Sequence, residues 1–385
     1  SYAAAVGQAV AVGKLVYDIS GRELDLGLVG LAEFLPTAML VLVAGALADR
    51  FDRRRLAAIG YAFETLISIG LAIYAFSEPT AVWPAFLLVF LFGTARGFVN
   101  PAARALPPSV APPGGLARLV SMHSAMWQFS IVVGPVVAGF LYVRGPAWPF
   151  VAFALFTTVS GVCMFLIELK VPQTPSKERP TLHSALEGLR FVRRTPILLA
   201  AIGLDLFAVL FGGAVALAPA LAEDRLDVGA IGLGMLRAAG GVGAAVTAIA
   251  LTFYPLRRLV GRRLLYAVGL FGLGTIGLGL TRSFVVALAL LAAIAAADMV
   301  SVYVRGTVVP LATPDAMRGR VLAVEAVFIG ASNELGAFES GVTAHWFGLV
   351  PAIVLGGILT IAVVIVWWFA FPALREVDRF DDIAV

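Results

Sequence analysis

Apolar stretches of about 20 residues recur along the whole chain, and short polar segments separate them. Each stretch is long enough to cross the ~30 Å hydrocarbon core of a bilayer as an α-helix. The pattern predicts twelve membrane-spanning helices, at residues 3–19, 27–48, 57–77, 82–103, 117–141, 148–169, 197–220, 230–253, 264–281, 284–309, 319–343 and 349–371. We therefore expect an all-α membrane protein rather than a soluble protein with a very large core.

The longest interruption of this pattern, residues 170–196, divides the spans into two sets of six. It begins with prolines and continues with Leu182, Leu186 and Leu189 among arginines, a spacing that predicts an amphipathic helix on the membrane surface. The expected domains are an N-terminal six-helix bundle at 1–169, a cytoplasmic linker at 170–196, a C-terminal six-helix bundle at 197–371 and a cytoplasmic tail at 372–385.

Composition and charge agree with this interpretation. The chain is 60% hydrophobic and only 14% charged, whereas soluble proteins are about 25% charged. If both termini are cytoplasmic, 20 of the 28 Lys and Arg residues lie in cytoplasmic segments and four lie in outer loops. This distribution follows the positive-inside rule. It also explains the net charge of +4 without a nucleic-acid partner.

Several kinds of chemistry have no support in the sequence. The single cysteine, Cys163, lies in an apolar span, where we expect a buried thiol that forms neither a disulfide nor a metal site. The three histidines are scattered, and we find no phosphate-binding P-loop and no Ser/His/Asp arrangement. We therefore expect no cofactor, no metal ion and no enzymatic activity.

A charged loop follows the second span, with six ionisable residues among the seven at 49–55. Such a group cannot enter hydrocarbon, so it must lie at one membrane face. The loop after the eighth span, from Tyr254 to Arg263, has the corresponding position in the second set of spans. It keeps the arginines and lacks the aspartate. Two related halves are a recurring plan of secondary transporters.

These motifs resemble the major facilitator superfamily. The pattern Gly45-x-x-x-Asp49-Arg50-x-x-Arg53-Arg54 is similar to the signature loop of that family, which usually has glycine where this chain has Asp52. The sequence of residues 49–55 resembles the branch of the enterobactin exporter and related drug–proton antiporters. Segments at 16–21, 27–32, 298–305, 314–321 and 332–341 resemble the same branch. The resemblance implies two pseudo-symmetric six-helix bundles in a bacterial cytoplasmic (inner) membrane.

The resemblance also implies two moving parts. Asp49 would contact the start of span eleven and hold the two halves closed on the cytoplasmic side. This gate would comprise Gly45, Asp49, Arg50, Arg53, Arg54 and Arg318. The motif Gly134-Pro135 with Gly139 resembles one associated with exporters, and it would bend and tightly pack span five as a hinge. A topogenic loop and ordinary helix packing remain the alternatives for these two features.

Ionisable residues inside spans are costly unless they are paired or hydrated, so they are candidates for function. Asp205 stands almost alone in an apolar span, which suits a group that binds and releases a proton; an interhelical hydrogen bond is the alternative. The proton-coupling candidates are Asp205, Glu33, Glu64 and Glu334. The candidates for a substrate or polar network are Arg96, Arg237, Asp298, Arg305 and Glu325. Asp298 and Arg305 share one helix face and are expected to join one network.

The sequence thus predicts a secondary transporter that exports a small organic molecule by proton antiport with alternating access. A siderophore is the first substrate class implied by the resemblance, and a hydrophobic drug, as in multidrug resistance, is the second. The expected partners are this substrate, protons and membrane lipid, with the protein acting as a monomer. Two alternatives stay open: a lipid translocase without proton coupling, and an importer of the same fold.

Overall fold

The computed structural model describes residues 1–50, 52–104, 106, 110, 116–167 and 182–383, with the backbone alone at 41–50, 101, 104, 116, 117, 120, 121, 182–185 and 316. The chain forms two compact units. Unit 1 comprises Ser1–Pro180 and Val228–Ala238, and unit 2 comprises Thr181–Asp227 and Ala239–Val385. The described residues form helices and no strands.

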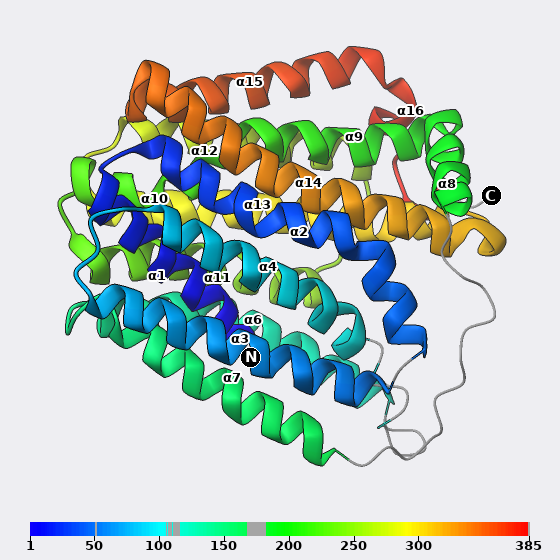
Figure 1. Cartoon of the computed structure of the whole chain (residues 1–385). Helices are drawn as coiled ribbons and strands as arrows, with labels where there is room; N and C mark the ends of the chain where they lie inside the picture. The colour runs from blue at the N-terminus through cyan, green and yellow to red at the C-terminus, as the bar shows by residue number, and fades with distance from the viewer. Residues whose placement is uncertain (51, 105, 107–109, 111–115, 168–181, 384–385) are drawn as a thin grey trace. The chain divides into compact units, whose positions relative to one another are not determined.

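Unit 1 is a bundle of long helices (Figure 1). Its helices are α1 (Tyr2–Ser20), α2 (Glu23–Arg50), α3 (Arg53–Phe76), α4 (Trp83–Arg104), α6 (Leu116–Tyr142) and α7 (Trp148–Leu166). Helix α1 packs against α6, α2 against α4, and α3 against both α4 and α7. The side chain of Asp52 caps the start of α3, and Gly21 ends α1 in the left-handed conformation at φ 61.

Unit 2 repeats the plan with additional short elements. Its helices are α8 (Leu182–Arg194), α9 (Pro196–Phe211), α10 (Ala218–Ala220), α11 (Gly229–Phe253), α12 (Val260–Leu280), α13 (Phe284–Leu311), α14 (Asp315–Phe347), α15 (Leu349–Ala370) and α16 (Pro372–Arg375). The first turns of α11 are grouped with unit 1. Helix α12 packs against α13 and α15, and α14 packs against α8 and α9.

A long helix is present at each span that the sequence predicts. Ten of the described helices are long and apolar enough to cross a membrane. Helix α1 is not among them, because Gln8, Lys14 and Asp18 lower its hydropathy, and α2 is described only as backbone at 41–50. The all-α membrane class is confirmed, and the count of twelve spans stays a prediction.

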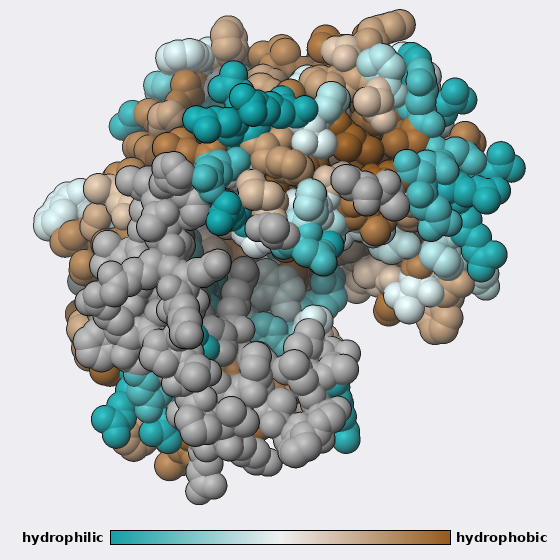
Figure 2. Space-filling model, turned by 90° about the vertical axis from the view of Figure 1, so that its right-hand side faces the viewer, coloured by the Kyte–Doolittle hydropathy of each residue, from teal (hydrophilic) through white to brown (hydrophobic). Residues whose placement is uncertain are grey.

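The outer surface is unusually apolar for a protein in water. Phe253, Val285, Trp346 and Phe369 are each more than 70% exposed. Lipid contact explains such side chains, which would form aggregation-prone patches on a soluble protein. Figure 2 views the end at which α8 and the C-terminal tail lie, and hydrophilic side chains gather there.

Cys163 lies on the exposed apolar surface, where we expect contact with lipid. The structure exposes it on α7, among the exposed apolar side chains of Val159, Val162 and Leu166. The expectation of a buried thiol was therefore wrong. The apolar character of the α7 sequence reflects contact with lipid rather than burial in the protein.

The span expected at 197–220 is interrupted. Helix α9 ends at Phe211, a 3₁₀ turn follows at Gly213–Leu217, and helical structure continues to Arg225 through a π-helical turn at Leu221–Arg225. The break lies at Gly212 and Gly213. A Cβ at Gly213 would lie 2.5 Å from the carbonyl oxygen of Gly336 and 2.7 Å from Ser340 Oγ. Gly213 therefore allows α14 to approach the backbone at the break, and Gly212 allows the close approach of Phe271 from α12.

The start of α12 is strained at Leu259, the residue before its first turn. Leu259 has φ 55, a left-handed conformation that costs a non-glycine residue about 1–2 kcal/mol. Its side chain is 43% exposed, so little packing depends on it. We expect Leu259→Asn to raise the free energy of unfolding by about 1 kcal/mol, because asparagine tolerates this conformation. Thermal unfolding in detergent would check this, with Arg257→Asn in the same loop as a control that should bring no gain.

Candidate functional site

Three charged side chains meet inside unit 2. Asp205 comes from α9, Arg305 from α13 and Glu325 from α14. Arg305 Nη1 forms an ion pair with Asp205 Oδ2, and Arg305 Nε lies 3.1 Å from Glu325 Oε1. The side chains of Arg305, Asp205 and Glu325 are only 6%, 7% and 11% exposed. We call these three residues the ion cluster.

The ion cluster is unbalanced in charge. Two carboxylates face one guanidinium, so the fully ionised group carries a net charge of −1. An uncompensated charge inside a protein is expensive, and the group becomes neutral when one carboxylate binds a proton. Its composition therefore makes the ion cluster a site that can take up and release one proton.

A small cavity adjoins the ion cluster. It has a volume of about 10 Å³, and its polar lining residues are Asp205, Asp298 and Ser301. A space of this size is enough for roughly one water molecule, which needs two or more polar partners to be stable. The cavity therefore places a third carboxyl group, that of Asp298, beside the same small polar space as Asp205.

Asp205 has an interhelical partner that its own span does not reveal. The sequence places it almost alone, but the structure pairs it with Arg305 from a helix 100 residues further along the chain. No described ion pair joins Asp298 directly to Arg305; Asp298 lines the cavity that Asp205 also lines, and the expected network with Arg305 stays a prediction. Residues seven apart on a helix share a face but lie about 10 Å apart along its axis, beyond the reach of an ion pair.

Unit 1 contains a looser group of the same residue types. Arg96 Nε of α4 lies 3.8 Å from Glu33 Oε1 of α2. Glu64 of α3 is 2% exposed, and next to it on α3 Ser68 donates a hydrogen bond of 2.7 Å to Gln8. Arg96 and Arg305 thus both lie on the fourth long helix of their unit, and each pairs with a carboxylate.

Two further candidates inside spans are Glu334 and Arg237. Glu334 is half-buried on α14, nine residues from Glu325. Arg237 lies on α11, and its Nε atom is buried without a hydrogen-bond partner among the described residues. A guanidinium with an unsatisfied buried donor can bind the acidic group of a ligand.

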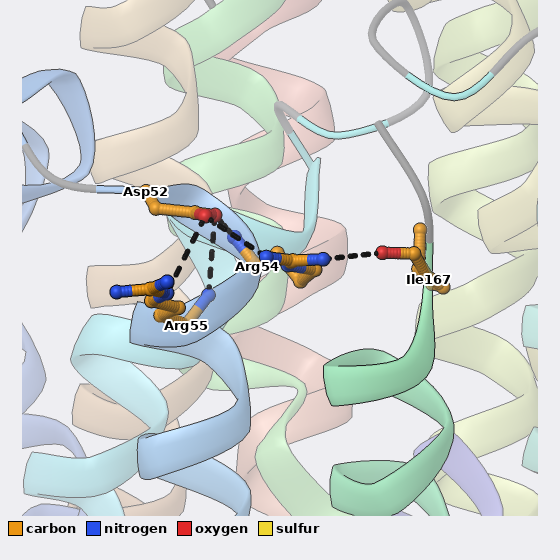
Figure 3. A network of polar contacts seen from close by, with 4 residues as sticks. All are labelled: Asp52, Arg54, Arg55 and Ile167. Atoms are coloured by element: carbon orange, nitrogen blue, oxygen red, sulfur yellow. Dashed lines mark hydrogen bonds and ion pairs between the residues drawn. The ribbon is translucent and has the colours of Figure 1, made fainter. Parts of the chain in front are cut away.

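The loop at the start of α3 is held by its own charges (Figure 3). The Asp52 carboxylate accepts hydrogen bonds from the backbone N–H groups of Arg54, at 2.9 Å, and Arg55, at 3.3 Å. Arg54 Nη1 donates a 2.8 Å bond to the carbonyl oxygen of Ile167, after the end of α7. The residue in the usual glycine position thus caps a helix, a role that an aspartate directly before the first helical residue could have signalled.

The rest of the expected gate is only partly described. Gly45, Asp49 and Arg50 lie on α2, where the structure describes the backbone but not these side chains, so the contact of Asp49 with span eleven stays a prediction. Arg53 lies in the first turn of α3. Arg318 forms an ion pair of 2.6 Å with Asp315 on its own helix, α14.

The expected amphipathic helix is present as α8. Its apolar face contacts the core of unit 2, where Val192 is 2% exposed and Leu189 and Phe191 pack against the same cluster. Arg320 of α14 donates a 2.6 Å bond to Glu187. Packing on unit 2 accounts for part of this face; Leu186 is 59% exposed, and contact of α8 with the membrane surface stays a prediction. The proline-rich part of the linker lies outside the described residues.

The expected hinge lies in α6, which continues as a helix through Pro135. A Cβ at Gly134 would lie 2.7 Å from the carbonyl oxygen of Ala3 and 3.1 Å from the N atom of Gly7. A Cβ at Gly139 would lie 2.5 Å from the carbonyl oxygen of Ala230, which belongs to the part of α11 grouped with unit 1. The glycines around Pro135 therefore permit two close helix contacts.

Comparison with known proteins gives consistent results. A family model described as "Transmembrane secretion effector" matches residues 2–384. The chain is 27% identical over 364 residues to YfiS of Bacillus subtilis, an uncharacterized MFS-type transporter, covering 90% of this chain and 84% of that protein. It is 26% identical over 342 residues to the enterobactin exporter EntS of Escherichia coli, covering 84% of this chain and 80% of that protein.

Solved structures share the fold at low sequence identity. A bacterial homologue of the human lysosomal transporter Spinster has a TM-score of 0.70 and 15% identity, over 97% of this chain and 95% of that chain. A POT family transporter in complex with 5-aminolevulinic acid has a TM-score of 0.76 and 11% identity, over 97% of this chain and 95% of that chain.

Proposed function

Because this chain belongs to the transmembrane secretion effector family of major facilitator transporters, we propose that it exports a small organic molecule by proton antiport. The protein is a transporter and not an enzyme. Export would proceed by alternating access, with both termini in the cytoplasm of a bacterial cell and the protein acting as a monomer. The uneven distribution of Lys and Arg supports this orientation.

The observation that carries the proposal of proton coupling is the charge imbalance of the ion cluster. Asp205 and Glu325 share one guanidinium, and all three side chains are buried. A proton bound by the cluster removes the net charge, and loss of that proton restores it. A change in water access during the transport cycle would then couple proton binding to the conformation of unit 2. Glu33 and Glu64, beside Arg96, would form a second site of the same kind.

Two observations support the proposed substrate class: similarity to the enterobactin exporter and the buried side chain of Arg237. The enterobactin exporter is 26% identical to this chain, which supports a siderophore, and a hydrophobic drug is the second possibility for the same branch. Arg237, whose buried Nε atom has no hydrogen-bond partner among the described residues, supports a compound that carries an acidic group. The motif around Pro135 supports export rather than import. Asp49 would close the cytoplasmic gate against α14.

A transport assay in inside-out vesicles tests the proposal. Candidate siderophores and drugs are added singly, and their uptake is measured with and without an imposed proton gradient. We expect at least one compound to accumulate only while the gradient is present, and to stop accumulating when a protonophore is added. Equal accumulation with and without the proton gradient would contradict proton antiport.

A further inference from the structure

The start of α12 has no cap of its own. The residue before the helix is Leu259, whose side chain has no hydrogen-bond acceptor, so the residue in the capping position forms no cap. The loop from Tyr254 to Leu259 contains no acidic residue. The first backbone N–H groups of any helix lack partners within that helix, so their partners must come from elsewhere.

The C-terminal tail supplies those partners. Asp378 Oδ1 accepts a 2.9 Å hydrogen bond from the N–H of Leu259, and the carbonyl oxygen of Asp378 accepts one of 3.2 Å from Val260. The carbonyl oxygen of Val377 accepts a 3.1 Å bond from Gly261. Three successive N–H groups at the start of α12 are thus satisfied by two successive residues of the tail.

Charge and packing hold the tail in this position. Arg258 Nε lies 3.4 Å from Asp378 Oδ2. The N–H of Leu259, with help from Arg258, lowers the pKa of Asp378 below its ordinary value, so the carboxylate stays ionised at neutral pH. Leu374 is 1% exposed, and its carbonyl oxygen lies where a side chain at Gly261 would be, so only glycine allows this approach.

The tail also contacts α13 next to the ion cluster. The rings of Phe380 and Tyr303 lie 6.1 Å apart in an edge-to-face arrangement, and Tyr303 is two residues before Arg305. Ile383 is buried in the same apolar cluster as Val304 and Val308. The tail thus connects the first turn of α12 to the part of α13 that carries Arg305.

In unit 1, the loop between α2 and α3 supplies the cap of its own helix, α3. Asp52 precedes α3, accepts two N–H groups of that helix and pairs with Arg54. In unit 2 the corresponding loop has the arginines but no aspartate, and an aspartate from a segment 119 residues away in sequence takes its place.

We propose that the C-terminal tail is a strap that supplies the cap missing from the α11–α12 loop. In this arrangement Asp378 is a positioning residue that fixes the first turn of α12 against α13. The attachment follows from the contacts of unit 2 alone. Its consequence for turnover rests on the proposed function, because the strap holds the helix that carries Arg305.

Hydrogen exchange in the intact transporter tests the attachment. In the unaltered protein, the amides of 259–261 should exchange more slowly than those of 256 and 257 in the same loop. Asp378→Ala should accelerate exchange at 259–261 by about 2- to 30-fold, the range for loss of a side-chain cap. Asp378→Asn keeps an acceptor oxygen and should retain most of the protection. Asp381→Ala removes one negative charge from the same tail at a residue with no described hydrogen bond to 259–261. It should leave exchange at 259–261 unchanged.

Transport in the same variants tests the positioning role. Asp378→Ala should lower maximal transport several-fold with little change in KM, whereas Asp378→Asn and Asp381→Ala should remain near the original rate. Equal exchange at 256–261 in the unaltered protein, or unchanged exchange in Asp378→Ala, would overturn the strap. Accelerated exchange with an unchanged transport rate would overturn its role in turnover and leave the proposed transport function intact.

Discussion

Replacement of Arg305 by methionine is expected to destabilise the protein by about 3–5 kcal/mol and to abolish transport. Arg305 is the cation of the ion cluster, and its loss leaves Asp205 and Glu325 buried without an opposite charge. Methionine is uncharged and flexible and has a volume close to that of arginine, although it is shorter, so it can fill most of the space. Thermal unfolding in detergent measures the first effect, and substrate flux into vesicles measures the second.

Two further variants identify charge as the cause. Arg193→Met removes an exposed arginine from α8 and should be nearly neutral in stability. Adding Asp205→Asn and Glu325→Gln to Arg305→Met should recover most of the stability, because no uncompensated charge remains. It should not recover transport, since the protonatable groups are gone. A triple variant as unstable as Arg305→Met would contradict the electrostatic explanation.

Replacement of Gly134 by valine is expected to cost about 3 kcal/mol or more and to separate α1 from α6. The Cβ atom alone would lie 2.7 Å from the carbonyl oxygen of Ala3, a backbone atom that cannot move without shifting the helix. Overpacking of this kind typically costs about 1–3 kcal/mol, and the two methyl groups of valine add to it.

Gly269→Val provides the matched control for the contact between α1 and α6. Gly269 also lies within a long helix, α12, and a Cβ there meets nothing within 4 Å. Thermal unfolding measures the loss of stability in each variant. The difference between the two losses is the cost of the contact at Gly134, because both contain the general cost of valine in a helix. Equal losses of stability in both variants would contradict a tight contact between α1 and α6.

The sequence predicts the helices well because their signal is local. An apolar stretch of about 20 residues is sufficient to predict a spanning helix, and ten such helices satisfy the criterion in the described structure. The break after Phe211 was missed, although two successive glycines are a recognisable signal. Its cause, the approach of Gly336, lies more than 100 residues away and has no local signature.

The candidate site was predictable residue by residue but not as an arrangement. Burial costs pointed to Asp205, Arg305 and Glu325 separately, because charged residues in apolar spans are rare. Which acid meets the arginine depends on how α9, α13 and α14 pack, and one sequence does not contain that information. The absence of an aspartate from the α11–α12 loop can be read from the sequence. That Asp378 takes its place cannot, because this contact also depends on how the chain packs.

The central claim, that the ion cluster couples substrate movement to proton movement, is tested most directly with Asp205→Asn in proteoliposomes. Two quantities are compared with the unaltered protein: compound-driven proton flux, and exchange of labelled for unlabelled compound at equal pH on both sides. The exposed Glu376, replaced by glutamine, serves as the control acid. We predict that Asp205→Asn loses the proton flux and keeps the exchange. Proton flux that survives in Asp205→Asn at the unaltered rate would contradict this account.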